Sequence, residues 1–407
     1  MSEAEAARCG GKALLAGALR TARERSLALF AAYEAALGPG LRVPCTPELN
    51  PPLWELGHIG WFADWWLARN PQLHRGVNAN PLAPRSPARQ TARGVDADAL
   101  YHSSQVAHDA RWRLDLPDAE AVRADLAASL SDTLTLLADA PDDDIGLYFF
   151  RLALFHEDMH AEAAVYMAQT LGFDPLDPQP AAPAAPRRPQ ALRIAPTDWT
   201  LGRSGPGFAF DNELGAHRVA VNGFEIDAQP VTWAQFLPFV ESGSYAQRRF
   251  WGAPGWIWRI SSTNGQERQA PRYLRQGEQG WEQQVFGHWQ ALDPAAPARH
   301  LTAFEAQAWC AWAGRRLPTE AEWEVAAQNR AFEWGSVWEW TASAFAPFPG
   351  FVPHPYVDYS APWFDGRPVL KGASRATATR MRHPKYRNYF TPERNDVVAG
   401  FRSVAAA

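Results

Sequence analysis

Two histidines, His156 and His160, stand four residues apart in the segment LFHEDMHAEA. In a helix, side chains at positions i and i+4 lie on one face about one turn apart, so one helix can offer both imidazoles to a metal ion. His58, in the segment LWELGHIGWF, is a candidate third ligand. Three neutral imidazoles would suit Fe(II), Zn or Cu, and the residue types alone do not choose among them. The sequence therefore predicts a metal site with three histidine ligands.

Other interpretations of these residues are open. HEDMH matches the HExxH pattern of zinc proteases, although no signature of a third protease ligand follows it. A lone histidine in an apolar helix, such as His58, is more often a packed core residue than a ligand. Glu162 follows His160 by two positions, so we expect it to accept a hydrogen bond from an imidazole or to form an ion pair on the helix face.

Long helices in the first half of the chain must position these groups. Apolar residues recur with helical spacing over 12–37, 119–139 and 145–171, and a fourth helix from Pro52 to about residue 70 carries His58. Residues 71–96 have no such period and are expected to form a loop. Four long helices predict an antiparallel bundle, which we assign to residues 1–173.

The second half of the chain has a different composition. Residues 174–197 are rich in proline and predict a stiff linker. Residues 198–407 combine short β-like segments (217–227 and 368–374) with short helices (232–243 and 302–314) and many Gly- and Pro-containing loops. The expected fold class is therefore a two-domain α+β protein whose second domain contains much irregular structure.

Composition excludes several classes of protein. The chain has 407 residues, of which 46% are hydrophobic and 20% charged, and a net charge of −5, which is typical of a globular protein with two or three domains. The acidic balance argues against a nucleic-acid partner, and no apolar run is long enough to span a membrane. Three cysteines cannot form a disulfide framework, and we see no signal peptide. We expect a cytoplasmic protein, either a monomer or a homodimer.

Beyond these arguments, the chain resembles a known enzyme family. The histidine pattern, with His58 in WELGHIGWF, resembles the DinB-like bundle of the ergothioneine-type sulfoxide synthases. Segments 300–327 (with RLPTEAEWE), 208–236, 335–343 and 399–404 resemble the formylglycine-generating-enzyme-like domain, which has a C-type-lectin-like fold. The resemblance covers residues 12 to 404. It implies an enzyme that binds nonheme Fe(II) through His58, His156 and His160, and that uses O2 to join a chalcogen to hercynine, the trimethyl betaine of histidine.

The resemblance also suggests which residues bind the substrates. A quaternary ammonium donates no hydrogen bonds and is best held by aromatic faces, which Trp338, Tyr386, Tyr389 and Phe390 could supply. Trp340 is expected to pack in the core instead. The catalytic Tyr of the family aligns by eye with Phe351, and then His354 or Tyr356 could replace it as the proton donor.

Some positions depart from the ergothioneine branch. Met159 stands where that branch has Gln. Asn388 and Arg394 are retained, but Phe390 replaces the Asp that helps to bind γ-glutamylcysteine. These departures resemble the selenoneine synthases, which use a seleno-sugar of the 1-seleno-glucose type and form a hercynyl selenoxide that yields selenoneine. The implied small-molecule substrates are therefore hercynine and a seleno-sugar. Two alternatives stay open: a sulfoxide synthase that uses cysteine, γ-glutamylcysteine or another thiol, and a lectin-like binding module without catalysis.

Overall fold

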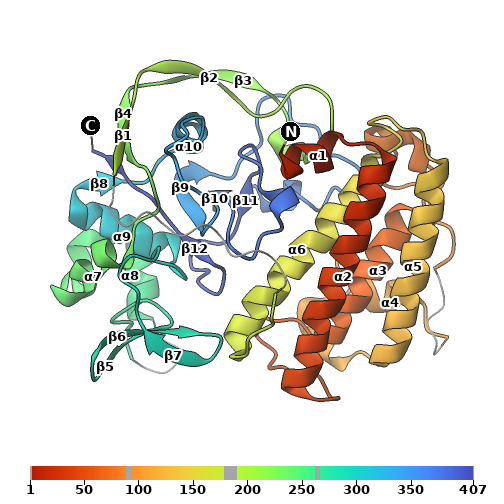
Figure 1. Ribbon diagram of the computed structural model, residues 1–407, viewed down its shortest axis with the longest axis horizontal. Coiled ribbons are helices and arrows are strands. Elements are labelled where there is room, and N and C mark those ends of the chain that lie inside the picture. Colours follow the sequence, from red (N-terminus) through yellow and green to blue (C-terminus); the bar gives the residue numbers. More distant parts are fainter. Residues whose placement is uncertain (1, 89–93, 178–189, 262–265, 407) are drawn as a thin grey trace.

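The computed structural model describes residues 2–88, 94–177, 190–261 and 266–406. Figure 1 shows a helical amino-terminal half beside a carboxyl-terminal half of short helices and small sheets. The chain is therefore an α+β protein, as predicted. In the part of the chain that the structure describes, no helix is long and apolar enough to cross a membrane.

Four long helices form the amino-terminal bundle: α2 (Lys12–Leu37), α3 (Pro52–Trp66), α5 (Ala119–Asp139) and α6 (Tyr148–Leu171). Helix α3 packs against both α5 and α6, and α2 packs against α6. Helix α6 ends at Gly172, whose φ of 83° is a left-handed conformation that favours glycine. The predicted helix bounds are confirmed within four residues. A short helix, α4 (Ala97–Tyr101), and two 3₁₀ turns at Leu73–Asn78 and His108–Arg113 lie between α3 and α5.

A further short helix, α1 (Glu3–Cys9), precedes the bundle and was not predicted. Its Arg8 forms a buried ion pair with Glu213 of the carboxyl-terminal half, with Nη1 2.5 Å from Oε2. Arg8 also donates to the Phe208 carbonyl. The first residues of the chain therefore pack on the second half of the molecule, which Figure 1 shows at the N label.

Within its described residues, the carboxyl-terminal half contains two four-stranded sheets, a two-stranded sheet and a three-stranded sheet. The strands are β1 (Ala191–Ile194), β2 (Thr197–Leu201), β3 (His217–Val221), β4 (Phe224–Asp227), β5 (Leu274–Gly277), β6 (Gly280–Val285), β7 (His288–Ala291), β8 (Arg315–Arg316), β9 (Trp338–Ala344), β10 (Pro368–Gly372), β11 (Asn388–Tyr389), β12 (Ala399–Gly400) and β13 (Val404–Ala405). The four-stranded orders are β1-β4-β13-β8 and β11-β10-β9-β12. The helices are α7 (Trp233–Glu241), α8 (Ala253–Ile260), α9 (Ala303–Ala313) and α10 (Glu320–Ala326).

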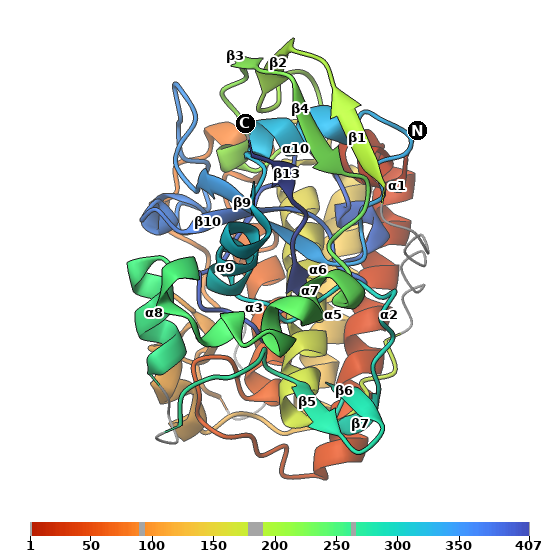
Figure 2. The same ribbon diagram turned by 90° about the vertical axis from the view of Figure 1, so that its left-hand side faces the viewer.

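The three-stranded sheet of β5, β6 and β7 lies beside the carboxyl end of α6 (Figures 1 and 2), where Phe286 donates its backbone N–H to Gln169. Strand β1 begins at Ala191, inside the segment predicted as a linker, and pairs with β4. Residues 178–189 of that segment lie outside the described residues, so the domain bounds stay a prediction.

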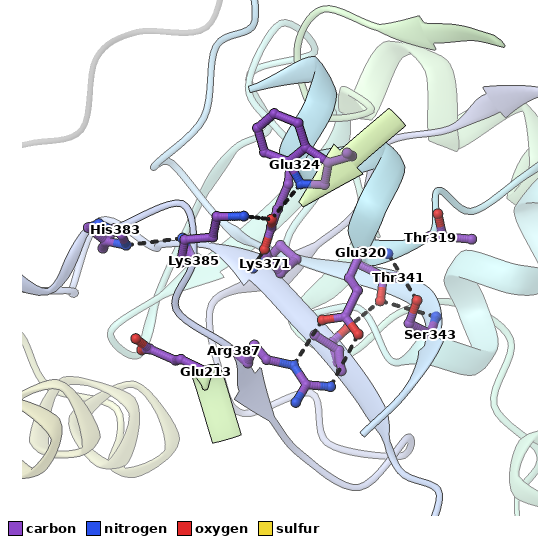
Figure 3. Close-up of polar contacts among 12 residues, drawn as sticks. Glu213, Thr319, Glu320, Glu324, Thr341, Ser343, Lys371, His383, Lys385 and Arg387 are labelled. Atoms are coloured by element: carbon purple, nitrogen blue, oxygen red, sulfur yellow. Dashed lines mark hydrogen bonds and ion pairs between the residues drawn. The ribbon is translucent and has the colours of Figure 1, made fainter. Parts of the chain in front are cut away.

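Buried ion pairs attach α10 to the segment that leads into β11 (Figure 3). Glu324 lies between Lys371 and Lys385, at 2.9 and 2.6 Å from their ammonium groups. Glu320 accepts two hydrogen bonds from Arg387, whose side chain is buried. Removing one partner of such a pair leaves a buried charge uncompensated, so these contacts hold the segment in place. Arg387 is followed directly by Asn388 and Tyr389 of β11, which border the cavity described below.

Candidate metal and substrate site

Three histidines from two bundle helices meet inside the protein. His58 on α3 and His156 and His160 on α6 place their ligand nitrogens within 4.8 Å of one another. Nε2 of His160 lies 3.1 Å from Nε2 of His156. His58 and His156 are buried, and His160 is half-buried. The structure thus brings together the three residues predicted as ligands.

Hydrogen bonds orient two of these rings. Nδ1 of His58 donates to the Tyr101 carbonyl at 2.8 Å. Nδ1 of His160 donates to Oε2 of Glu55 at 2.5 Å, and Glu55 in turn accepts from the Asn50 amide. An imidazole fixed through one nitrogen presents the other to a metal, which is the usual arrangement around metal-binding histidines. Nδ1 of His156 has no hydrogen-bond partner among the described residues.

Burial keeps the imidazoles of His58 and His156 neutral. Burial, and next the neighbouring His160, lowers the pKa of His58 to about 3. Burial also lowers the pKa of His156 well below its usual value. Burial alone would raise the pKa of Glu55, but His160, His58 and Arg111 together lower it, so Glu55 is ionised. Neutral imidazole is the form that binds metals, so the donor set fits a divalent ion such as Fe(II).

The acidic residues beside the triad do not act as the sequence suggested. Glu157, the acid of the HExxH match, pairs with Arg23 at 2.8 Å, so its carboxylate is held by a buried guanidinium. The expectation that Glu162 accepts from an imidazole is wrong, because its carboxylate accepts from Trp338 and from two hydroxyls of the carboxyl-terminal half. Glu55 fills that role instead. It was missed because the contact joins two helices 105 residues apart in sequence.

A cavity of about 350 Å³ adjoins the triad at Glu55. The residues predicted to bind substrates all line it: Met159, Trp338, Tyr386, Asn388, Tyr389, Phe390 and Arg394. Strands β9 and β11 flank β10 and carry Trp338 and Tyr389 to this wall. Sequence reasoning missed Tyr166 and Tyr359, which also line the cavity. Trp340 lies outside it, fully buried and bonded to the Leu301 carbonyl, as expected for a core residue.

The three predicted catalytic residues separate in the structure. The ring of Tyr356 lies 5.1 Å from that of Phe62 and 6.5 Å from that of His156, so it borders the triad. It also lines a second cavity, of about 400 Å³, together with three tryptophans of α3. His354 does not contact the triad: its Nδ1 is 3.0 Å from the Tyr148 hydroxyl. Phe351 packs on Phe364 and lines neither cavity.

Tyr356 is therefore the best placed of the three for proton transfer. Burial raises the pKa of Tyr356, so the phenol keeps its proton at neutral pH. Phe351, which aligns with the catalytic Tyr of the family, has its ring contact with Phe364 and not with the triad.

Comparison with known proteins agrees with this architecture. The DinB superfamily model matches residues 18–169, and the sulfatase-modifying factor enzyme 1-like domain matches residues 178–336. The hercynine oxygenase of Mycolicibacterium smegmatis is 32% identical over 95% of this chain and 97% of its own length. That of Mycobacterium tuberculosis is 31% identical over 88% of this chain and 91% of its own. The formylglycine-generating enzyme of Bos taurus is 33% identical over 34% of this chain and 40% of its own.

Proposed function

Since the chain belongs to the family of the hercynine oxygenases, we propose that it oxidises hercynine with O2 at an Fe(II) ion held by His58, His156 and His160. We further propose that the second substrate is a seleno-sugar of the 1-seleno-glucose type. The net reaction replaces one imidazole C–H and one Se–H by a C–Se bond, adds one oxygen atom to selenium and releases water. The hercynyl selenoxide formed in this way yields selenoneine.

The state of Arg394 is the observation that carries the choice of donor. Its guanidinium makes two hydrogen bonds with Asp396, at 2.5 and 2.6 Å, and lies over the Phe390 ring at 5.0 Å. A guanidinium that is already paired in this way does not form a bidentate pair with the carboxylate of a peptide thiol. Phe390 has no charge to pair with the amino group of such a thiol. An uncharged sugar has neither a carboxylate to pair with Arg394 nor an amino group to pair with residue 390.

The geometry supports the following roles for the chain's own residues. Bound at the triad, Fe(II) would supply the activation of O2. Three protein ligands leave coordination positions for the two substrates and O2. The cavity lined by Trp338, Tyr389 and Phe390 holds hercynine with its imidazole toward the triad, and Tyr356 donates a proton from the side of Phe62.

Product analysis tests this proposal. The protein is loaded with Fe(II) and incubated under O2 with hercynine and either the seleno-sugar, cysteine or γ-glutamylcysteine, and products are identified by mass. We expect the selenoxide, or selenoneine after its elimination, with the seleno-sugar only. Turnover restricted to a thiol would overturn the choice of donor and favour a sulfoxide synthase. Failure to bind Fe(II) at micromolar concentration would overturn both activities and leave a binding module.

A further inference from the structure

Glu162 has an unusual set of hydrogen bonds. One of its oxygens, Oε1, accepts from Trp338 Nε1 at 2.7 Å, Ser374 Oγ at 2.9 Å, Thr377 Oγ1 at 2.8 Å and the Tyr166 hydroxyl. All four donors are neutral. Within the described residues, Oε2 has no hydrogen-bond partner, and Glu162 lines the cavity beside the triad. The carboxylate is thus fixed by one oxygen while its charge is not neutralised by a basic group.

The other carboxylates of the cavity have basic or metal-site partners. Four acidic residues line the cavity: Glu48 pairs with Arg272 at 2.7 Å, Asp396 pairs with Arg394 at 2.5 Å, and Glu55 accepts a hydrogen bond from Nδ1 of His160 at 2.5 Å. Among the described residues, Glu162 has no such partner. Arg382 is within electrostatic reach of Glu162, but its guanidinium donates to the Thr377 carbonyl. Of the four cavity carboxylates, Glu162 is therefore the one that is held neither by an arginine nor by a histidine of the triad.

Aromatic rings surround this charge. The cavity is lined by Tyr166, Trp338, Tyr359, Tyr386, Tyr389 and Phe390. A carboxylate among aromatic faces is the environment that best stabilises a quaternary ammonium, which has a full positive charge but no hydrogen to donate. A primary amine would lose more of its hydration here, because most of the wall offers it no acceptor.

We propose that Glu162 and the rings around it bind the trimethylammonium group of hercynine, which makes Glu162 a specificity-determining residue. This inference rests on the proposed function. Glu162 follows His160 by two positions on α6, and Met159, Glu162, Ala163 and Tyr166 share the face that lines the cavity. At about 1.5 Å per residue, two positions separate His160 and Glu162 by about 3 Å along α6, and their side chains leave the helix in different directions. The same helix can therefore present the metal to the imidazole and the carboxylate to the ammonium.

A binding experiment on the full chain tests the inference without turnover. Hercynine is titrated by calorimetry into protein loaded with Fe(II) under nitrogen, and into protein without Fe(II). Glu162→Gln keeps the shape and removes the charge, so we expect hercynine to bind about tenfold more weakly or worse. Glu162→Asp keeps the charge and should retain more affinity than Gln. The matched control is Glu48→Gln, a cavity carboxylate already paired with Arg272, for which we expect a smaller loss than for Glu162→Gln.

The results test the proposed function and the role of Glu162 separately. If hercynine binds neither form of the wild-type protein, the proposed function itself is overturned. If the wild type binds hercynine and Glu162→Gln binds it equally well, only the role of Glu162 is overturned. Should Glu162→Gln fail to fold, the wild-type protein is tested instead by measuring whether tetramethylammonium competes with hercynine for binding. Competition with hercynine supports the ammonium site, and absence of competition up to saturating tetramethylammonium refutes it.

Discussion

Glu55 of α3 accepts a hydrogen bond from Nδ1 of His160 on α6, at 2.5 Å, across the contact between the two helices that carry the triad. The carboxylate is buried and ionised, because His160, His58 and Arg111 together outweigh the effect of burial on its pKa. This bond fixes the rotation of the His160 ring. It also couples the position of α3, which supplies His58, to that of α6.

Glu55→Gln should therefore weaken Fe(II) binding by about 10- to 100-fold, the usual effect of losing a carboxylate behind a metal-binding histidine. The amide can still accept a hydrogen bond, but it no longer stabilises the bound form by charge. The measurement is an anaerobic Fe(II) titration of the variant against the wild type. Equal affinity would show that the Glu55 carboxylate does not support the metal site.

His58→Ala should abolish Fe(II) binding, and with it turnover, because only two imidazoles would remain. His102→Ala is a matched control, since His102 lies near Trp61 and Trp65 and outside the triad. Metal content after dialysis and oxygen consumption check both variants. A His58→Ala protein that keeps iron and near-normal activity would mean that His58 is a packed core residue.

Much of this site follows from the sequence, and the exceptions have physical causes. The i, i+4 spacing of His156 and His160 is local information, and helical periodicity located α6 to within a few residues. The Glu55–His160 bond and the Glu162 network are contacts between distant segments, which no local pattern encodes. Helix α1 was missed for the same reason, because seven residues form a stable helix only through tertiary contacts such as Arg8 with Glu213.

The loop after β9 could not be aligned reliably from the sequence. Its residues have no helical or strand periodicity, so no pattern fixes which residue takes the catalytic position. The sequence alignment placed the catalytic position at Phe351, whereas Tyr356 is the residue whose ring approaches that of His156. A shift of five positions moves the candidate proton donor from outside the cavity to the edge of the triad.

Tyr356→Phe should lower kcat by about 10²- to 10⁴-fold, the range typical of a lost general acid, while leaving the affinity for hercynine nearly unchanged. The variant keeps the ring that packs on Phe62 and removes only the hydroxyl. Steady-state kinetics with separate hercynine titrations distinguish the two effects. A rise in KM at constant kcat would assign Tyr356 to binding instead of proton transfer.

Phe390→Asp should impair use of the seleno-sugar. The new carboxylate would compete with Asp396 for Arg394, whose guanidinium lies over the Phe390 ring in the wild type. It would also put a negative charge where the cavity wall is uncharged. We expect kcat/KM for the sugar donor to fall, with hercynine affinity less affected. Val352→Asp is the control, since this side chain is exposed and lines neither cavity. Unchanged kinetics in Phe390→Asp would mean that Phe390 does not contact the donor.

Acid should destabilise the fold in part through His354. Burial lowers its pKa to about 4, against an ordinary value of about 6.5, so between these values the unfolded state binds the proton and the native state does not. Stability must then rise with pH across this window and fall as pH decreases through it. Integrated from pH 7 to pH 5, the loss is roughly 2 kcal/mol. His354→Gln should lose correspondingly less stability over that range in urea unfolding of the metal-free protein. An identical acid loss in His354→Gln and the wild type would show that His354 is protonated alike in both states.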